Sequence, residues 1–178
     1  MEKRLRKFLP AGMPLFFACA ALAGSVFAAR PEERDCSFQP NPEIQLWLKR
    51  VFADDPEERK LLFSEEEVKA CKTEEDGKTL FREKIARLAE QAGGPERFVG
   101  ELLYIGSRAT DVQEGMLPVV IVHQWDIAPD AIADALKPYL ASEDKRMAAE
   151  AAELLEGVEW WKREYGDRFK RMFETPED

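Results

Sequence analysis

Apolar residues recur every three or four positions along most of this chain, and the runs begin at residues that typically start helices. Asn41-Pro42 places a capping side chain before a proline at the first helical position. Ser64 and Glu67 form the pattern of a capping box. Residues at this spacing share one face of an α-helix, and that face must be buried against another element. The sequence therefore predicts an all-α protein built from packed amphipathic helices.

Helix signals continue through the middle of the chain. A long helix is predicted to follow Thr73 and to end at Gly93-Gly94, where Pro95 begins the next one. The stretch from Met116 to Trp125 is richer in β-branched residues and would suit a buried strand. Because no other segment of residues 41–178 looks like a strand that could pair with it, we predict a helix there too. A capping-box pattern that begins at Thr110 predicts where this helix starts.

Residues 1–28 have the three-part layout of a secretory signal peptide. Four basic residues precede an uncharged, mostly apolar run from Phe8 to Ala29, and Val26 and Ala28 suit cleavage after Ala28. A run of this length could instead stay as a membrane anchor, or Cys19 could carry a lipid although the residues before it match a lipobox poorly. Prolines and glycines in the run weaken a continuous helix, which favours cleavage. We therefore expect export to the periplasm or to the outside of the cell.

The exported chain is predicted to have two parts. Residues 29–40 are polar and contain two prolines, so we expect a flexible leader. Residues 41–178 are long enough for one helical domain with its own core. In an oxidising compartment Cys36 and Cys71 could form a disulfide across these two parts, and the alternative is two unpaired thiols.

Charge and motif content exclude several classes of partner. Removal of residues 1–28 leaves 22 basic and 34 acidic residues, a net charge of −12. Such a surface repels phosphate backbones and anionic lipids, so we expect neither nucleic-acid binding nor membrane binding after cleavage. The sequence has one histidine and no closely spaced cysteine pair, and it lacks phosphate-binding and dinucleotide-binding motifs. No metal or cofactor is therefore expected.

The most regular pattern is a helical hairpin between residues 129 and 155. Pro129 is predicted to begin the first helix, which runs through Leu136 and Leu140 and is bent at Pro138. Ser142-Glu143-Asp144 forms the turn. A second helix follows, and it continues toward the C-terminus either unbroken or with a bend near Gly157.

This hairpin resembles one unit of a HEAT repeat, the helical unit of α-solenoid scaffolds. The family's proline within the first helix is matched by Pro138, and its turn aspartate by Asp144. The small and apolar positions of the second helix are matched by Met147, Ala151, Leu154 and Leu155. Ala148 stands where an arginine is common, and Arg146 lies two positions earlier.

The resemblance implies a short HEAT-like α-solenoid of stacked hairpins, because a lone unit cannot bury its apolar face. It covers about one repeat, and an irregular helical bundle is the alternative fold. It also implies a non-catalytic scaffold that binds an unidentified protein partner.

The single histidine and two clusters of acidic residues suggest an alternative, catalytic function. His123 and the acidic clusters Glu65-Glu66-Glu67 and Glu74-Glu75-Asp76 could serve a hydrolase of the cell envelope that is built on a helical frame. No nucleophile motif accompanies His123, and both acidic clusters lie at predicted helix starts, where negative charge complements the helix dipole. The sequence therefore favours a binding protein over an enzyme.

Aromatic residues form a stripe along the C-terminal helix, with basic residues beside it. The stripe comprises Trp160, Trp161, Tyr165, Phe169 and Phe173. Two interpretations stay open: the stripe seals the end of the helical stack, or it binds a partner, since aromatic side chains concentrate in binding hot spots.

Overall fold

The computed structural model describes residues 38–165. Within that range the chain forms helices and no β-strand, which confirms the predicted all-α class. The elements in chain order are α2 (Pro42–Val51), α3 (Pro56–Lys60), α4 (Glu65–Ala70), α5 (Glu74–Ala92), α6 (Pro95–Gly106), α7 (Val112–Gln124), α8 (Pro129–Leu136), the 3₁₀ helix η1 (Lys137–Ala141) and α9 (Lys145–Tyr165).

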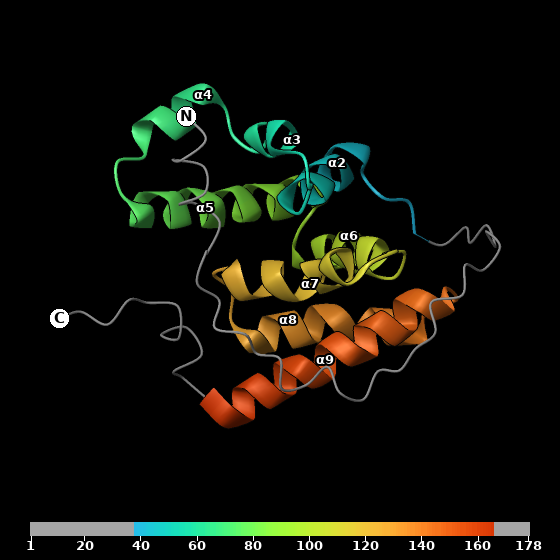
Figure 1. Cartoon of the computed structure of the whole chain (residues 1–178). Helices are drawn as coiled ribbons and strands as arrows, with labels where there is room; N and C mark the ends of the chain where they lie inside the picture. Colours follow the sequence, from blue (N-terminus) through green and yellow to red (C-terminus); the bar gives the residue numbers. More distant parts are fainter. Residues whose placement is uncertain (1–37, 166–178) are drawn as a thin grey trace.

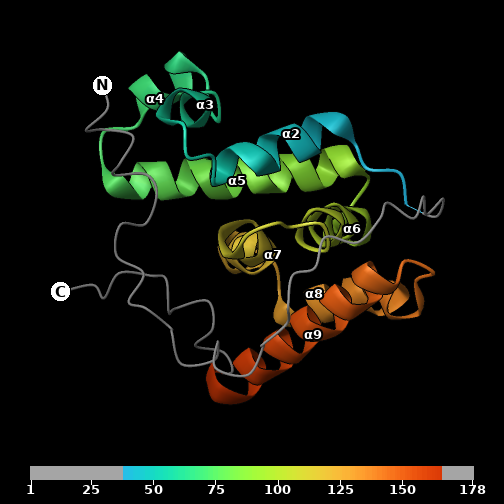
Figure 2. The same cartoon turned by 45° about the vertical axis from the view of Figure 1, so that its right-hand side comes forward.

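The longer helices lie in three layers of two helices each (Figures 1 and 2). The first layer holds α2 and α5, the second holds α6 and α7, and the third holds α8 and α9. The short helices α3 and α4 lie on the outer side of the first layer. Chain order follows layer order, so helices that are close in sequence are also close in space.

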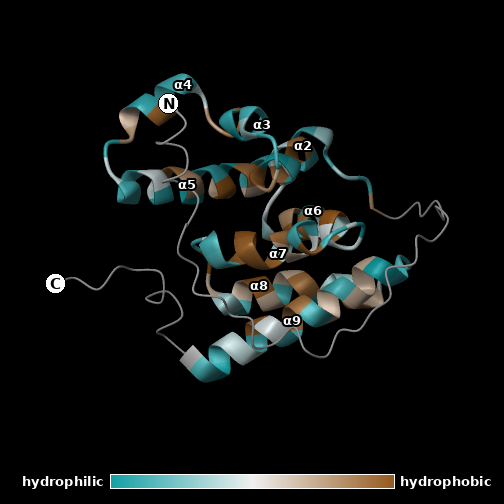
Figure 3. Ribbon diagram, viewed as in Figure 1, coloured by the Kyte–Doolittle hydropathy of each residue, from teal (hydrophilic) through white to brown (hydrophobic). Residues whose placement is uncertain are grey.

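Helix α6 lies at the centre of this arrangement, and from Phe98 to Gly106 every residue except Tyr104 is buried. Phe98, Val99, Leu102 and Leu103 are each 0% exposed, and α6 packs against α5 and α2 on one side and α8 and α9 on the other. Apolar residues accordingly concentrate on α6, α7 and α8 in the interior (Figure 3). Gly100 is required here, because an added Cβ would lie 2.2 Å from the hydroxyl oxygen of Tyr139.

Several predicted helix boundaries are confirmed by their caps. The Asn41 side chain accepts hydrogen bonds from the first turn of α2, and Ser64 and Glu67 form the predicted capping box of α4. Gly93 ends α5 in the left-handed conformation with φ of 104°. The start of α7 differs from the prediction. Asp111 rather than Thr110 is the N-cap, since its carboxylate accepts from the backbone N–H of Glu114.

The hairpin between residues 129 and 155 is shorter in its first helix than predicted. Helix α8 ends at Leu136, and Pro138 lies in η1, so the proline does not bend a continuous α-helix. The physical reason is that proline lacks the N–H that the helix needs and clashes with the preceding turn, and here a tighter 3₁₀ turn resolves the clash. Helix α9 runs unbroken through Gly157, which settles the choice left open by the sequence.

Residues 38–40, predicted as the end of a flexible leader, are part of the folded domain. Phe38 packs on the rings of Tyr104 and Tyr139, at centroid distances of 6.0 and 6.1 Å. The guanidinium of Arg97 lies over the Phe38 ring at 4.2 Å, and it donates a hydrogen bond to the carbonyl of Gln39. These three neighbours hold the Phe38 ring in place, although the polar residues around it predict a flexible leader.

Asp144 joins the second layer to the third. One oxygen of its carboxylate accepts from the backbone N–H groups of Arg146 and Met147, which caps the start of α9. The other accepts from Arg108, the residue that follows α6 by two positions, at 2.7 Å. Burial raises the pKa of Asp144, but the hydrogen bonds from Arg108 and Met147 outweigh it and hold this pKa below its ordinary value. The predicted turn aspartate thus has an arginine partner, which is Arg108 and not the nearby Arg146.

Replacing Asp144 with alanine is expected to lower the free energy of unfolding by about 2–3 kcal/mol. The change removes a helix cap and also the carboxylate that accepts a hydrogen bond from Nη2 of Arg108. Urea unfolding followed by circular dichroism measures the loss. Glu143→Ala, at the exposed neighbouring position, serves as the control and is expected to change stability by less than about 0.5 kcal/mol. Equal effects of the two substitutions would contradict this account of Asp144.

Candidate functional site

The structure divides the predicted aromatic stripe. Trp161 is only 9% exposed and belongs to the core, and its ring centroid lies 3.8 Å from that of His123 on α7. Trp160 is partly buried against the same core. The side chain of Tyr165, together with Phe169 and Phe173, lies outside the described residues. In the part described, Trp161 packs α9 against α7, and the two interpretations of the stripe both stay open.

His123 is placed poorly for catalysis at neutral pH. Burial lowers its pKa from 6.5 to about 4, so the imidazole is neutral under ordinary conditions. Trp161 packs directly on the ring, at an interplanar angle of 58°. A base of such low pKa also takes up a proton weakly at pH 7.

One acid of each acidic cluster, Glu67 and Asp76, completes a helix-capping box in the structure. The carboxylate of Glu67 accepts from the backbone N–H of Ser64, and this bond lowers the pKa of Glu67. The carboxylate of Asp76 accepts from the N–H groups of Thr73 and Lys72 in the same way, with the same effect on its pKa. Among residues 38–165, no group of three or more histidine, cysteine, aspartate or glutamate side chains could hold a metal ion.

Cys71 ends α4 and is half-buried. Its thiol donates to the carbonyl of Glu67 at 3.4 Å, and burial together with the nearby carboxylates of Asp76, Glu67 and Glu83 raises its pKa. A raised pKa leaves little reactive thiolate at neutral pH. Cys36 lies outside the described residues, so the disulfide between them stays a prediction.

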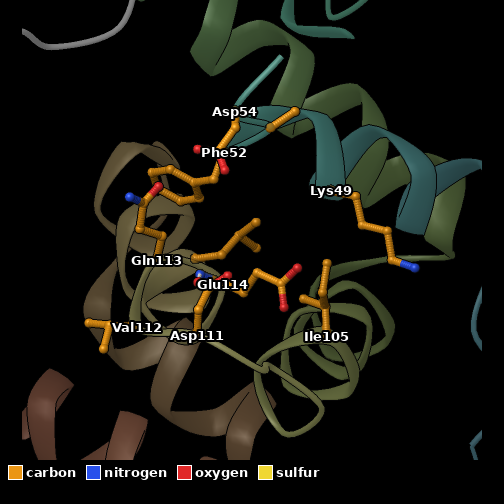
Figure 4. A pocket seen from close by; sticks show the side chains of 10 residues that line it. Lys49, Phe52, Asp54, Ile105, Asp111, Val112, Gln113 and Glu114 are labelled. Carbon is orange, nitrogen blue, oxygen red and sulfur yellow. Dashed lines mark hydrogen bonds between the residues drawn. The ribbon is translucent and has the colours of Figure 1, made fainter.

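A groove lies where α2 ends, close to the end of α6 and the start of α7 (Figure 4). Its volume is about 450 Å³. Its lining residues are Lys49, Phe52, Ala53, Asp54, Ile105, Asp111, Val112, Gln113, Glu114 and Leu117. Ile105 and Leu117 are buried residues of the core, so the bottom of the groove is the apolar interior itself.

Local helix signals create this groove. Because Asp111 caps α7, Val112 is the first residue of the helix and its side chain is 75% exposed. Met116, one turn further along, is 47% exposed. On the opposite side α2 ends after Val51, and the chain turns away with Phe52 half-buried at the edge of the groove. The sequence did not predict this site, because its residues come together only through the packing of α2, α6 and α7.

The rim of the groove is predominantly acidic. Asp54, Asp111 and Glu114 line it, and Lys49 is the single basic residue among its lining residues. Figure 4 shows Glu114 between the side of the groove that holds Phe52 and the side that holds Lys49. Glu114 also accepts a hydrogen bond from the backbone N–H of Thr110 at 3.1 Å. The arrangement is an apolar surface bordered by fixed negative charge.

A second hollow, of about 580 Å³, lies beside Gln39, Asn41, Arg97 and Glu101. Its charged groups already have partners. Glu101 is 0% exposed and accepts from the backbone N–H of Asn41 and from the side-chain amide of Gln45. Burial raises the pKa of Glu101 despite these bonds. The hydrogen bonds of Glu101 beside this hollow hold α2 on α6.

The chain matches no protein-family model, and no curated protein or solved structure is significantly similar to it. Among residues 38–165, no helix combines the length and the apolar character that crossing a bilayer requires.

A partly buried acid, Glu150, lies where α6, α7 and α9 meet. A Cβ added to Gly106 of α6 would lie 2.7 Å from the ring of Pro118 on α7 and 2.8 Å from the carboxylate oxygen of Glu150 on α9. Burial, with a smaller contribution from the charge of Glu153, raises the pKa of Glu150 to about 7. Glu150 is therefore partly protonated at neutral pH.

The titration of His123 is expected to contribute a loss of stability in acid. Its pKa is near 6.5 when unfolded and about 4 when folded, so the unfolded chain binds the proton more tightly between these values. Stability is therefore lost as pH falls from 6.5 toward 4. Between pH 7.5 and 4.5 we expect the wild type to lose about 2 kcal/mol more than His123→Gln, measured by urea unfolding at each pH. Parallel pH profiles for the two proteins would refute this.

Glu150 is expected to act in the opposite direction. Its folded pKa of about 7 lies above its unfolded value of 4.5, so stability is gained as pH falls from 7 toward 4.5. Glu150→Gln removes the buried charge, and we expect it to stabilise the protein by about 1–3 kcal/mol at pH 8.5 and by little at pH 5. Thermal unfolding at both pH values checks this. Glu156→Gln, at an exposed position of the same helix, is the control, and a Glu150 variant no different from it would contradict the assignment.

Proposed function

We propose that this chain is an exported, non-catalytic protein-interaction domain that binds its partner in the groove between α2, α6 and α7. The observation that carries the proposal is the exposed apolar side chain of Val112 beside an apolar floor, inside a concave surface. Apolar side chains grouped in a groove mark interaction sites, whereas single exposed ones need no explanation. Export rests on the signal-peptide pattern of residues 1–28.

HEAT-like stacking is part of the same proposal. It is supported by the resemblance of residues 129–155 and by the order of the layers, in which each helix pair packs on the pair that precedes it in the chain (Figure 2). The ion pair between Arg108 and Asp144 fits this picture, because it joins one layer to the next. Stacked helix pairs commonly present extended surfaces to protein partners.

The alternative, a cell-envelope hydrolase, has weaker support. Of the acids in the groove, Asp111 accepts from the backbone N–H of Glu114, and Glu114 accepts from that of Thr110. Both carboxylates therefore have structural roles at the start of α7. His123 packs on Trp161 and does not line the groove.

Photo-crosslinking in the cell that exports the protein tests the proposal. A benzophenone amino acid in place of Gln113, which is exposed in the groove, is expected to give one discrete adduct with another polypeptide. The additional change Val112→Asn is expected to reduce the adduct by about tenfold, because it removes an exposed apolar contact. The yield of adduct is read by immunoblotting.

Two controls make this result specific. The same crosslinker in place of Leu140, which is 41% exposed on η1 and outside the groove, is expected to give no such adduct. The Val112 variant should unfold at the same urea concentration as the wild type, because its side chain is mostly exposed. Adducts of equal yield from both positions, or none from Gln113, would reject the groove as the binding site.

A further inference from the structure

We propose that the groove binds a basic amphipathic segment of the partner, in which lysine or arginine residues flank a bulky apolar side chain. This inference rests on the proposed function, since it assumes that a protein partner occupies the groove. It goes further by stating the chemistry of the segment that binds.

The acidic rim determines the sign of the partner's charge. Three lining residues, Asp54, Asp111 and Glu114, are acidic and only Lys49 is basic. A segment with acidic residues would be repelled at close range, and one with basic residues would be attracted. The net charge of the whole chain, −9, adds a long-range attraction of the same sign.

Two of these charges are held in place before any partner binds. Asp111 caps α7 through the N–H of Glu114 at 2.9 Å, and Glu114 reaches back to the N–H of Thr110 at 3.1 Å. The carboxylates therefore keep fixed positions at the groove. A preorganised rim costs less conformational entropy on binding than flexible side chains would.

The floor of the groove determines the apolar part of the segment. Phe52 and Val112 present apolar surface that solvent reaches, above the buried side chains of Ile105 and Leu117. The volume of about 450 Å³ lies within the range of about 300–1,000 Å³ that is usual for ligand pockets. A bulky aliphatic or aromatic side chain would fill such a hollow and displace water from its floor.

Peptide binding to the purified protein tests this chemistry. The probe is a short fluorescent peptide that alternates lysine with leucine and phenylalanine, and the matched peptides carry glutamine or glutamate in place of lysine. By fluorescence anisotropy at low salt, we expect the lysine peptide to bind at least about tenfold more tightly than the glutamine peptide. The glutamate peptide should bind least, and high salt should reduce the differences.

Substitutions that remove an acidic or a basic residue of the groove test whether the charge dependence of peptide binding arises there. Asp54→Asn is expected to weaken binding of the lysine peptide by about two- to fivefold, and Lys49→Gln to strengthen it by a similar factor. Glu143→Gln, an exposed acid in the turn before α9, is the control and should leave binding unchanged. Val112→Asn is expected to weaken the binding of all three peptides, because it alters the apolar contact and not the charge.

Failure of the basic-segment proposal can be told apart from failure of the groove as a binding site. The proposal that a basic segment binds in the groove would be overturned by either of two results. One is equal binding of the lysine, glutamine and glutamate peptides, and the other is equal effects of Asp54→Asn and Glu143→Gln. The crosslinked adduct from Gln113 would still support a partner in the groove. If mass spectrometry of that adduct identified residues 166–178 of the same chain or a second copy of it, the proposal of a separate partner would be overturned. A separate protein crosslinked at a lysine- or arginine-rich apolar segment would support it.

Discussion

The burial of α6 between two layers of helices is the constraint on which the remaining structure depends. Its core residues, such as Phe98 and Leu102, are shielded from water only when the layers above and below are both in place. Burying such side chains stabilises a fold by about 1.5–3 kcal/mol each. Gly100 permits the close approach of Phe38 and Tyr139, so even the chain that enters α2 helps to cover α6. The outer helices are therefore required for the core and are not additions to it.

The all-α class and many helix boundaries could be predicted from the sequence, because they follow from local signals. The caps at Asn41, Ser64 and Thr73 and the left-handed Gly93 act within a few residues of themselves. Local signals were insufficient where two alternatives competed at neighbouring positions. Thr110 and Asp111 can both cap a helix, and the structure uses Asp111.

Contacts between distant residues could not be predicted in the same way. Asp144 was identified as the turn aspartate, but its partner Arg108 lies 36 residues earlier and precedes α7. Phe38 lies among polar residues that suggest a leader, and only the positions of Tyr104 and Tyr139 explain why it is ordered. The groove was missed for the same reason. It combines residues of three elements, and their common location depends on how the layers pack.

Two partly buried groups near the contacts of α9 with α6 and α7 respond oppositely to protons. His123 prefers to be neutral in the folded state, and Glu150 prefers to be protonated there. On unfolding in mildly acidic solution the histidine takes up a proton while the glutamate releases one, so the net exchange with solvent is small. The contributions of these two groups to the pH dependence of stability therefore largely cancel in mildly acidic solution.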